Sequence, residues 1–335
     1  MYRNHTIAVV IPAYNEAGLI GRVIDTVPDY VDRVYAIDDR STDDTWAEIQ
    51  AAAASVNRRR EQTEPQAAVA DGGHDAPRVV AMRNEVNQGR GASVKRGYKR
   101  ALADGMDIVA VMDGDGQMDP AVLDRILDPV VERRADYAKG NRLANGAWDG
   151  MSRFRLFGNM VLSFLTKLSS GYWEVSDSQN GYAAISREAL EELDIDDLYE
   201  DYGFENDILA KLNLHDMRVA DVPHPAVYGD ETSTIKYNTF IPRVSMLLLG
   251  NFVHRMKSKY FGENFHPVAL CYALGVLAVL AGLVTGAFTL LTLAEGTLAE
   301  GMLSVVVFLF GALSLVLALA VDVRLNAHLA ADPEA

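Results

Sequence analysis

Short apolar runs alternate with stretches of helical periodicity over the first two thirds of the chain. The apolar runs predict buried strands at 6–12, 34–37, 78–82, 107–112, 137–140, 181–186 and 218–222. The periodic stretches predict helices at 19–27, 45–56, 91–103, 122–134, 154–168 and 204–214. Strands that alternate with helices imply right-handed crossovers. We therefore expect a Rossmann-like α/β domain, with a mainly parallel sheet and flanking helices. Residues 58–76 are polar without an apolar period and predict a flexible surface insertion.

Two long apolar stretches follow, at 267–293 and 301–321, and neither contains a charged residue. Both are long enough to cross a bilayer, so they predict two transmembrane helices, with two buried core helices as the alternative. Positive charges flank the pair, at Arg243, Arg255, Lys257, Lys259 and Arg324. The hairpin between the stretches has no Lys or Arg. The positive-inside rule then predicts a multi-pass protein of the cell membrane, with both termini and the preceding soluble domain in the cytoplasm.

The segment before the first apolar stretch, 240–261, has helical periodicity with an apolar and a basic face. The apolar positions are Ile241, Val244, Leu248, Phe252 and Met256. The basic positions are Arg243, Arg255 and Lys257. This pattern predicts a helix that lies in the membrane interface, with an ordinary packed helix as the alternative. We therefore expect a catalytic domain at 1–235, an interfacial segment at 236–265 and a transmembrane hairpin at 266–327.

Composition narrows the class of protein. The 335 residues carry a net charge of −15, which argues against a nucleic-acid partner. Asp outnumbers Glu and Arg outnumbers Lys, as in the acidic, lysine-poor surfaces of proteins from high-salt cytoplasms. The single cysteine, Cys271, excludes a disulfide framework and a cysteine-based zinc site within one chain.

The clearest candidate chemistry follows the fourth predicted strand, in the stretch Asp113-Gly-Asp-Gly-Gln. Alternate positions of an extended segment share a face, so Asp113, Asp115 and Gln117 can converge. Oxygen donors at the carboxyl end of a strand suit Mg²⁺ or Mn²⁺, completed by water and phosphate oxygens. The alternative is an acidic, glycine-rich turn on an acidic surface. Asp119 and Pro120 predict the cap of the next helix.

Polar residues also follow the first two strands, in Ile11-Pro-Ala-Tyr-Asn-Glu and Asp38-Asp-Arg-Ser-Thr-Asp. Adjacent strand ends form one crevice, where a carboxylate can accept hydrogen bonds from a base N–H or from ribose hydroxyls. The stretch Asn87-Gln-Gly-Arg-Gly-Ala then opens a helix, and its glycines and helix N-terminus could take phosphate charge. It is not a Walker loop, because no Gly-Lys-Ser/Thr follows.

In this order, over 6–230, the motifs resemble those of family 2 glycosyltransferases of the GT-A fold. The most similar subgroup is the polyprenyl-phosphate or dolichyl-phosphate hexosyltransferases, in an archaeal, halophile-like type. Four blocks carry the resemblance: Asp-Gly-Asp-Gly-Gln-Met-Asp-Pro at 113–120, Gly-Asn-Arg at 140–142, Asp-x-Gln-x-Gly-Tyr at 177–182 and Tyr-Gly-Phe-Glu-Asn-Asp at 202–207. The resemblance implies a GT-A domain, to which the C-terminal interfacial helix and two transmembrane helices are added.

The resemblance also implies roles for individual residues. On the nucleotide it implies Pro12, Ala13, Tyr14, Glu16, Asp39, Gly89 and Asp113. At the metal and the diphosphate it implies Asp113, Asp115 and Gln117, with Mg²⁺ or Mn²⁺ as cofactor. At the acceptor phosphate it implies Arg142, Arg153 and Arg155, for the last two of which a solvated helix face is the alternative. Asp177 is expected to contact the sugar or to act as a residual base, with a helix or turn cap as the alternative.

One departure concerns the segment after the last predicted strand. Tyr228 stands where many relatives have an arginine, and Lys236 is the next cation along the chain. The diphosphate contacts of this segment, and with them the identity of the donor, stay open.

We expect an inverting enzyme that moves a hexose from a nucleotide sugar to dolichyl or polyprenyl phosphate at the cytoplasmic leaflet, for N-glycosylation or cell-surface glycosylation. UDP-glucose is the favoured donor, with UDP-N-acetylglucosamine and GDP-mannose open. A phosphate monoester has a second pKa of about 6, so this acceptor needs cations rather than a base. The alternatives are transfer to a lipid-linked sugar, with Asp177 as the base, and a catalytically silent nucleotide-binding scaffold. Gly275, Gly282 and Gly286 would also allow homo-oligomerisation through the spans.

Overall fold

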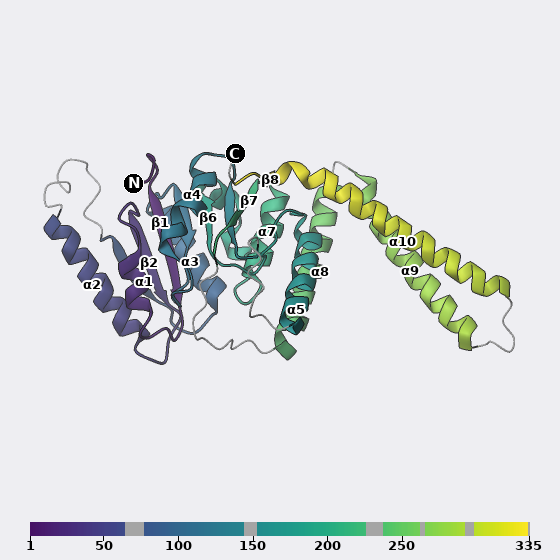
Figure 1. Ribbon diagram of the computed structural model, residues 1–335, viewed down its shortest axis with the longest axis horizontal. Helices are drawn as coiled ribbons and strands as arrows, with labels where there is room; N and C mark the ends of the chain where they lie inside the picture. The colour runs from purple at the N-terminus through teal and green to yellow at the C-terminus, as the bar shows by residue number, and fades with distance from the viewer. Residues whose placement is uncertain (64–76, 144–152, 226–236, 262–264, 292–297, 334–335) are drawn as a thin grey trace. The chain divides into compact units, whose positions relative to one another are not determined.

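The computed structural model describes residues 1–63, 77–143, 153–225, 237–261, 265–291 and 298–333 (Figure 1). Within these ranges, side chains are described except at 153–157, 159 and 237–239. The chain forms two compact units. The first comprises Met1–Leu249 together with Leu329–Ala335, and the second comprises Gly250–His328.

The first unit is built on an eight-stranded sheet. Its strands are β1 (Ile7–Ala13), β2 (Arg33–Asp38), β3 (Val79–Arg83), β4 (Ile108–Val111), β5 (Tyr137–Asn141), β6 (Ala183–Ser186), β7 (Val219–Pro223) and β8 (Ala330–Ala331). Their order in the sheet is β3-β2-β1-β4-β6-β5-β7-β8. Strand β6 runs antiparallel to β4 and β5, and the other neighbouring pairs are parallel. The predicted mainly parallel sheet is confirmed.

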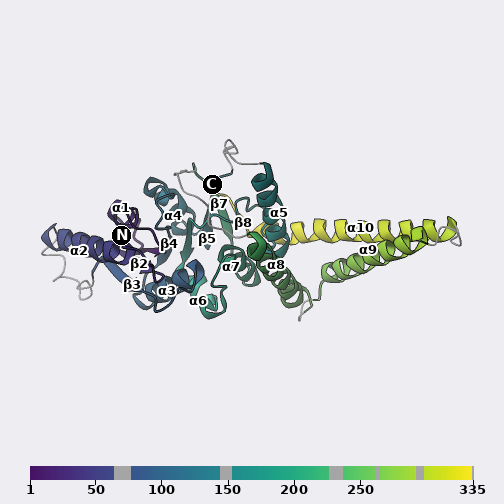
Figure 2. The same ribbon diagram turned by 90° about the horizontal axis from the view of Figure 1, so that it is seen from below.

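Helices cover both faces of this sheet. They are α1 (Ile20–Thr26), α2 (Thr45–Thr63), α3 (Arg90–Ala103), α4 (Leu123–Val131), α5 (Arg153–Ser170), α6 (Arg187–Glu192), α7 (Phe204–Leu214) and α8 (Tyr237–Tyr260). Figure 2 shows α1 and α4 on one side of the sheet and α3 and α6 on the other. Alternate residues of β1 accordingly enter two cores: Val9 lies in the core that contains α1, α2 and α4, and Val10 in the core that contains α3, α6 and α7. Burial on both faces explains why the strands appear as continuous apolar runs.

The N-terminal half of the sheet unit departs from prediction at one helix. Helix α2 continues to Thr63 instead of ending at residue 56, so the expected insertion at 58–76 begins as helix. The polar end of this helix is held by side-chain bonds. Arg59 pairs with Asp25 at 2.6 Å, and the Arg60 guanidinium donates to the Asp32 carbonyl at 3.3 Å. The remainder of the segment, 64–76, lies outside the described residues.

Several short elements were not predicted, among them α6, the 3-10 turn Ile195–Asp197 and β8. Each is too short to show a period in the sequence. Strand β8 follows the last apolar stretch and pairs with β7, and the adjacent Leu329 is fully buried in the sheet unit. The chain therefore returns to the first unit after completing the second.

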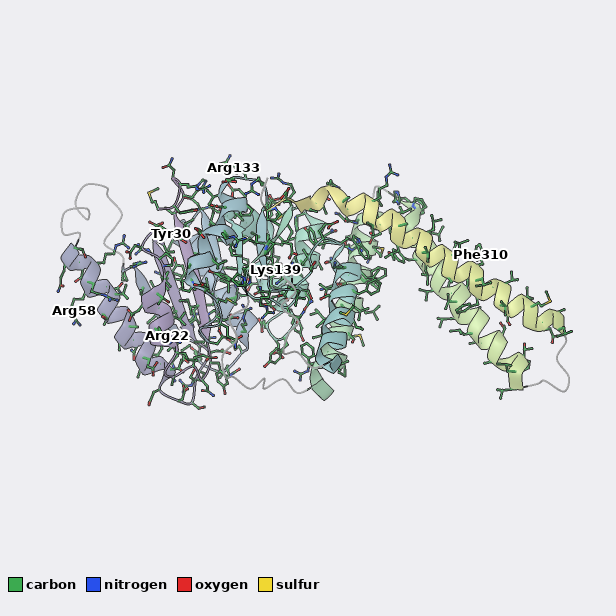
Figure 3. All side chains as sticks on the ribbon, in the orientation of Figure 1. Arg22, Tyr30, Arg58, Arg133, Lys139 and Phe310 are labelled. Carbon is green, nitrogen blue, oxygen red and sulfur yellow. The ribbon has the colours of Figure 1, made fainter. Side chains whose placement is uncertain are left out.

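The second unit consists of the end of α8 and the helices α9 (Pro267–Leu291) and α10 (Leu298–Asn326), which pack side by side in Figures 1 and 2. Glycines bring α9 and α10 close together. A Cβ at Gly282 would lie 2.7 Å from the Phe308 backbone nitrogen, and one at Gly311 would lie 2.5 Å from that of Val279. Both helices are long and apolar enough to cross a membrane. Most of their apolar side chains face outward, as Phe310 does in Figure 3.

Helix α8 orients its faces differently from the prediction. Three of the five predicted apolar positions, Val244, Leu248 and Met256, are buried within the protein. The exposed apolar side chains are Ile241, Met246, Leu249 and Val253. The helix therefore carries apolar residues on more than one side, and periodicity alone did not show which side packs against protein.

Arg255 was predicted to lie on the basic face of this helix, opposite the apolar face, and it is instead buried. Its side chain is fully buried in the second unit, where Nη1 and Nη2 each donate to the Asp322 carboxylate at 2.8 Å. Tyr260 donates its hydroxyl to the same carboxylate at 3.1 Å, and Asn326 Nδ2 donates at 3.0 Å. The partner lies 67 residues away, on α10, which continues five residues past the predicted end at 321.

Candidate active site

The carboxyl ends of β1, β2 and β4 meet at one edge of the sheet, as predicted. Ala13 at the end of β1 is paired with Asp38 at the end of β2, and the Asp39 amide donates to the Ala13 carbonyl at 2.9 Å. On the other side of β1, the Gly114 amide donates to the Pro12 carbonyl at 3.1 Å. The motif at 113–117 thus lies directly beside the first two strand ends.

The 113–117 motif forms a compact turn. Asp115 Oδ1 accepts a hydrogen bond from the Gln117 amide at 2.9 Å, and Asp119 Oδ1 caps the following turn through the Ala121 amide, also at 2.9 Å. Asp113 Oδ1 accepts from Arg90 Nε at 2.7 Å. No three His, Cys, Asp or Glu side chains within the described part of the chain are placed to hold a metal. A divalent ion here would therefore combine the two aspartates with Gln117, water and phosphate oxygens, which fits the hard oxygen donors present.

Asp39 is buried and already has three donors. Its carboxylate accepts from Asn84 Nδ2 at 2.7 Å, from the Gln88 amide at 3.0 Å and from the Gly89 amide at 2.7 Å. These bonds fix the loop that leads into α3. The predicted contact of Asp39 with the nucleotide stays a prediction, and the structure adds this anchoring role.

The glycines at the start of α3, Gly89 and Gly91, allow the backbone of residues 199 and 200 to pack closely against the helix. A Cβ at Gly89 would lie 2.9 Å from the Glu200 carbonyl oxygen, and one at Gly91 would lie 2.7 Å from that of Tyr199. The Ala92 amide donates to the Glu200 carbonyl at 3.1 Å. A carbonyl from another loop therefore occupies part of the helix N-terminus that we predicted would bind phosphate, and the phosphate role of Gly89 stays a prediction.

The remaining predicted nucleotide residues lie along the same edge. Pro12 and Ala13 are buried at the end of β1, and the Tyr14 side chain is exposed. The Glu16 amide donates to Thr45 Oγ1 at 2.7 Å, which ties this loop to the start of α2. An exposed aromatic ring beside buried strand ends is suited to cover a bound base.

Arg142 and Asp177 form a two-pronged ion pair on the acceptor side of the predicted site. Arg142 Nε donates to Asp177 Oδ2 at 2.8 Å and Nη2 donates to Oδ1 at 3.2 Å. The backbone amide of Arg142 adds a third bond, to Oδ2, at 3.2 Å. Burial by itself would raise the pKa of Asp177, but the bonds and charge of Arg142 outweigh it and lower that pKa. Asp177 is therefore ionised, paired with Arg142 and a weak base.

The other acceptor residues cannot be placed as completely. Helix α5 begins at Arg153, so Arg153 and Arg155 lie in its first turn, and their side chains are outside the described set. Tyr228 and Lys236 lie outside the described residues.

The sequence model of the family described as glycosyl transferase family 2 matches residues 8–194, more than half of the chain. The chain belongs to glycosyl transferase family 2. The match spans the strand ends at Pro12 and Asp39, the 113–117 motif and the Arg142–Asp177 pair. This family 2 chain is a glycosyltransferase.

Similar proteins agree with this membership. The UDP-N-acetylglucosamine–dolichyl-phosphate N-acetylglucosaminyltransferase of Methanococcus voltae is 28% identical over 73% of this chain and 96% of its own length. The polyprenol monophosphomannose synthase of Mycolicibacterium smegmatis is 29% identical over 64% of this chain and 75% of its own. Glucosyl-3-phosphoglycerate synthase from Mycobacterium tuberculosis shares the fold, with a TM-score of 0.50 at 21% identity over 75% of this chain and 80% of its own. The predicted GT-A fold is confirmed.

A buried polar network lies behind the ion pair of this glycosyltransferase. Lys139, labelled in Figure 3, is fully buried on β5 and donates to the Asn180 carbonyl. Burial lowers the pKa of Lys139 to about 8, against the opposing pull of Glu205 and Asp177. Asn180 Nδ2 lies 2.7 Å from His224 Nε2. The network fixes the loop that carries Asp177 onto the sheet.

Asp221 on β7 completes this network. Its Oδ2 accepts from Asn141 Nδ2 at 2.6 Å and from the Ser176 amide at 3.2 Å. Its buried Oδ1 has no hydrogen-bond partner among the described residues. Burial raises the pKa of Asp221 to about 6. An oxygen without a donor in a buried carboxyl is consistent with a group that holds its proton up to about pH 6.

The sequence analysis missed Arg90, Lys139, Asp221 and His224. The sequence contains only weak indications of these residues. Lys139 is a charged residue within the apolar run at 137–140. Arg90 lies in a stretch whose glycines, rather than its arginine, we interpreted as the functional feature. Their partners lie far away in sequence, for example 115 residues between Arg90 and Glu205. Only the fold brings these groups together.

Proposed function

We propose that this enzyme transfers a hexose, with inversion, from a nucleotide sugar to dolichyl or polyprenyl phosphate. The observation that carries the proposal is the Arg142–Asp177 pair, in which the candidate base is engaged by an arginine and its pKa is lowered. A hydroxyl acceptor needs a base to remove its proton. A phosphate acceptor is largely ionised and instead needs cations to hold it.

Arg142 is the cation that we assign to the acceptor phosphate, with Arg153 and Arg155 at the start of α5. The Arg142 side chain is 35% exposed, whereas that of Asp177 is 5% exposed. Its carboxylate partner therefore holds the guanidinium from the buried side and leaves it accessible to a ligand. Two relatives support the acceptor class, because their names specify dolichyl phosphate and polyprenol monophosphomannose.

We assign a Mg²⁺ or Mn²⁺ ion to Asp113, Asp115 and Gln117. When bound, the ion would neutralise charge on the leaving diphosphate. The chain's own residues position the donor: Pro12, Ala13, Tyr14, Glu16 and Asp39 line the strand ends, and the loop before α3 is held in place by Asp39. Donor identity stays open, with UDP-glucose the first choice and UDP-N-acetylglucosamine and GDP-mannose the other candidates.

We further propose that α9 and α10 span the cell membrane, with the catalytic unit and both termini in the cytoplasm. Two helices of this length and hydropathy are by themselves weak support, since a buried core helix passes the same test. The exposure of their side chains adds to that support. In the most apolar 18-residue stretch of α9 only 28% of the residues are buried, and in that of α10 only 17%. Exposed Ile241, Met246 and Leu249 on α8 support a segment that lies at the lipid surface. The three-part division at 235 and 265, homo-oligomerisation through the spans and a place in N-glycosylation belong to the same proposal.

The test is to incubate membranes containing the enzyme with labelled UDP-glucose, UDP-N-acetylglucosamine or GDP-mannose, each with dolichyl phosphate. We expect one donor to yield a labelled lipid phosphate sugar. Label that enters only an added lipid-linked saccharide would replace the proposal with transfer to a sugar hydroxyl. Absence of transfer from every donor, with nucleotide binding intact, would favour the silent scaffold.

Asp177→Asn separates the two acceptor classes. If the acceptor is a phosphate, turnover at saturating acceptor should fall by no more than about tenfold, because no base is lost. If a hydroxyl must be deprotonated, the loss should be about 10²–10⁴-fold. The measurement is the initial rate at saturating donor and acceptor, and the acceptor KM should rise because Arg142 loses its partner.

A further inference from the structure

Arg90, the first residue of α3, lies between carboxylates from distant parts of the chain. Its Nε donates to Asp113 Oδ1 at 2.7 Å, its Nη1 donates to Glu205 Oε1, and its Nη2 donates to the Gly181 carbonyl at 3.3 Å. Asp113 opens the proposed metal motif, and Glu205 lies in the first turn of α7. One guanidinium therefore balances two negative charges at the edge where the donor is proposed to bind.

The Arg90 side chain is partly exposed. The side chain of Arg90 is 31% exposed and that of Asp113 is 23% exposed. Lys139, which also lies near Glu205, is fully buried and donates to the Asn180 carbonyl, and Arg142 holds Asp177. Arg90 is thus a partly exposed arginine whose charge lies directly on the proposed metal motif.

The backbone at the same helix N-terminus is less available to an anion. The Glu200 carbonyl accepts the Ala92 amide, and the carbonyls of residues 199 and 200 pack against Gly89 and Gly91. Positive charge for a diphosphate at this edge must therefore come mainly from side chains. A planar guanidinium suits phosphate oxygens better than a single amide does.

We propose that Arg90 changes partner during donor binding: it neutralises Asp113 in the donor-free enzyme and turns to the diphosphate of the nucleotide sugar once Asp113 is bound to a divalent cation. A guanidinium and a divalent cation on the same carboxylate repel each other, and an added diphosphate attracts both. Glu205 keeps the arginine side chain at the site during this change. The inference rests on the proposed nucleotide-sugar donor, and it concerns the donor half of the site alone.

Gly181 provides a second way to move the guanidinium. A Cβ added at Gly181 would overlap the Arg90 guanidinium and lie 3.1 Å from Asp113 Oδ2. The overlap is with the end of a flexible side chain. Gly181→Ala should therefore displace the guanidinium from Asp113 while keeping its charge in the site.

The experiment uses the full chain in detergent micelles and needs no acceptor. Mn²⁺ binding without nucleotide is measured by electron paramagnetic resonance. The binding of UDP and of GDP at saturating Mn²⁺ is measured by calorimetry. In Arg90→Gln we expect the Kd for Mn²⁺ to fall about tenfold, because a competing cation is removed from Asp113. We expect the Kd for the nucleoside diphosphate to rise about tenfold or more, because a charge-assisted bond is lost.

Two control variants distinguish an exchange of partners by Arg90 from a general disruption of the site. Gly181→Ala should also tighten Mn²⁺ binding, but with less loss of nucleotide affinity than Arg90→Gln. Arg100→Gln on the same helix removes an arginine from an exposed pair with Asp104 and should change neither affinity.

Opposite changes in the two affinities support the proposal. A parallel loss of both affinities in Arg90→Gln and Gly181→Ala would show a merely structural role and overturn it, as would two unchanged affinities. A wild-type enzyme that binds Mn²⁺ with UDP or GDP, yet transfers no sugar to lipid phosphate, overturns the proposed function and leaves this inference standing.

Discussion

Two arginines in the site hold partly or largely buried carboxylates that would otherwise be unpaired. Arg90 holds Asp113 at 2.7 Å, and Arg142 holds Asp177 at 2.8 Å. Removing one partner of such a pair leaves the other charge poorly solvated, and this costs more than the pair contributes. Substitutions at these four residues therefore report on both partners at once.

Asp115, whose Oδ1 accepts a hydrogen bond from the Gln117 amide, offers a second test at the residue scale. Asp115→Ala should lower turnover by about 10²-fold or more, since one of two carboxylates proposed for the metal is lost. The melting temperature should change little. The measurement is the initial rate over a titration of Mg²⁺ and Mn²⁺.

Glu191→Ala is the matched control for Asp115→Ala. It removes one negative charge from an exposed pair with Arg187, and its rate should equal that of the wild type. Full wild-type activity in excess EDTA would contradict the metal assignment.

The buried carboxyl of Asp221 predicts a pH dependence of stability. Its pKa is raised from 3.8 to about 6, so the folded protein binds this proton more tightly than the unfolded chain does. The protonated Asp221 carboxyl therefore makes its full contribution to the free energy of unfolding below about pH 4. This contribution, up to about 3 kcal/mol, is lost as the pH rises through about 6. Asp221→Asn should remove this loss, so its stability relative to the wild type should increase between pH 4 and pH 7.

Tryptophan fluorescence during unfolding provides the measurement for Asp221→Asn. Trp46 and Trp173 belong to the sheet unit, and Trp148 lies outside the described residues. Asp29→Asn, at an exposed carboxylate, is the control and should leave the pH profile unchanged. A profile of Asp221→Asn identical to that of the wild type would show that Asp221 is ionised throughout this range.

At the scale of elements, sequence periodicity predicted most helices and strands but not which side of α8 packs inward. Local patterns decide whether a segment is a helix, and α7 occupies 204–214 as expected. The burial of Val244 and the exposure of Met246 depend on neighbours that are remote in sequence. The same limit applies to the site: strand ends predicted the meeting of Pro12, Asp39 and Asp113, whereas Arg90 and Lys139 required the fold.

The buried Arg255–Asp322 pair predicts non-additive substitutions within the second unit. Arg255→Met should destabilise the protein by about 3–5 kcal/mol, because Asp322 is left as a buried unpaired charge. The double variant Arg255→Met with Asp322→Leu should recover most of that loss. The measurement is thermal unfolding of the full chain in micelles, followed by helical circular dichroism.

The exposed pair Arg187–Glu191 serves as the control for that cycle. Arg187→Met should cost less than about 1 kcal/mol, since an exposed pair contributes little. If the single substitutions at Arg255 and Asp322 add without coupling, the two charges are not energetically paired.

At the scale of the whole molecule, the chain leaves the sheet unit through α8 and returns to it at Leu329. Strand β8 then pairs with β7, and Arg134 donates to the Asp332 carbonyl at 2.5 Å. This return was not predicted, because two strand residues beyond a long apolar helix leave no readable pattern. It also revises the expectation that the sheet unit is complete without the C-terminal residues.

A chain that ends at His328 should therefore have a less stable sheet unit. The loss of buried Leu329 alone is worth about 2–5 kcal/mol, equivalent to a melting temperature lower by roughly 4–20 °C. The measurement is thermal unfolding followed by tryptophan fluorescence. A chain that ends at Asp332 retains β8 and should melt like the full chain. Equal melting of all three chains would show that the returning segment contributes nothing.

The return of the chain also orders events during synthesis. A ribosome makes β1 to β7 first, then the two apolar helices, and only afterwards Leu329 and β8. While the last segment is still in the exit tunnel, one edge of the sheet lacks its strand and Leu329 is absent from the interior. The sheet unit thus reaches its final form only after α9 and α10 have been synthesised.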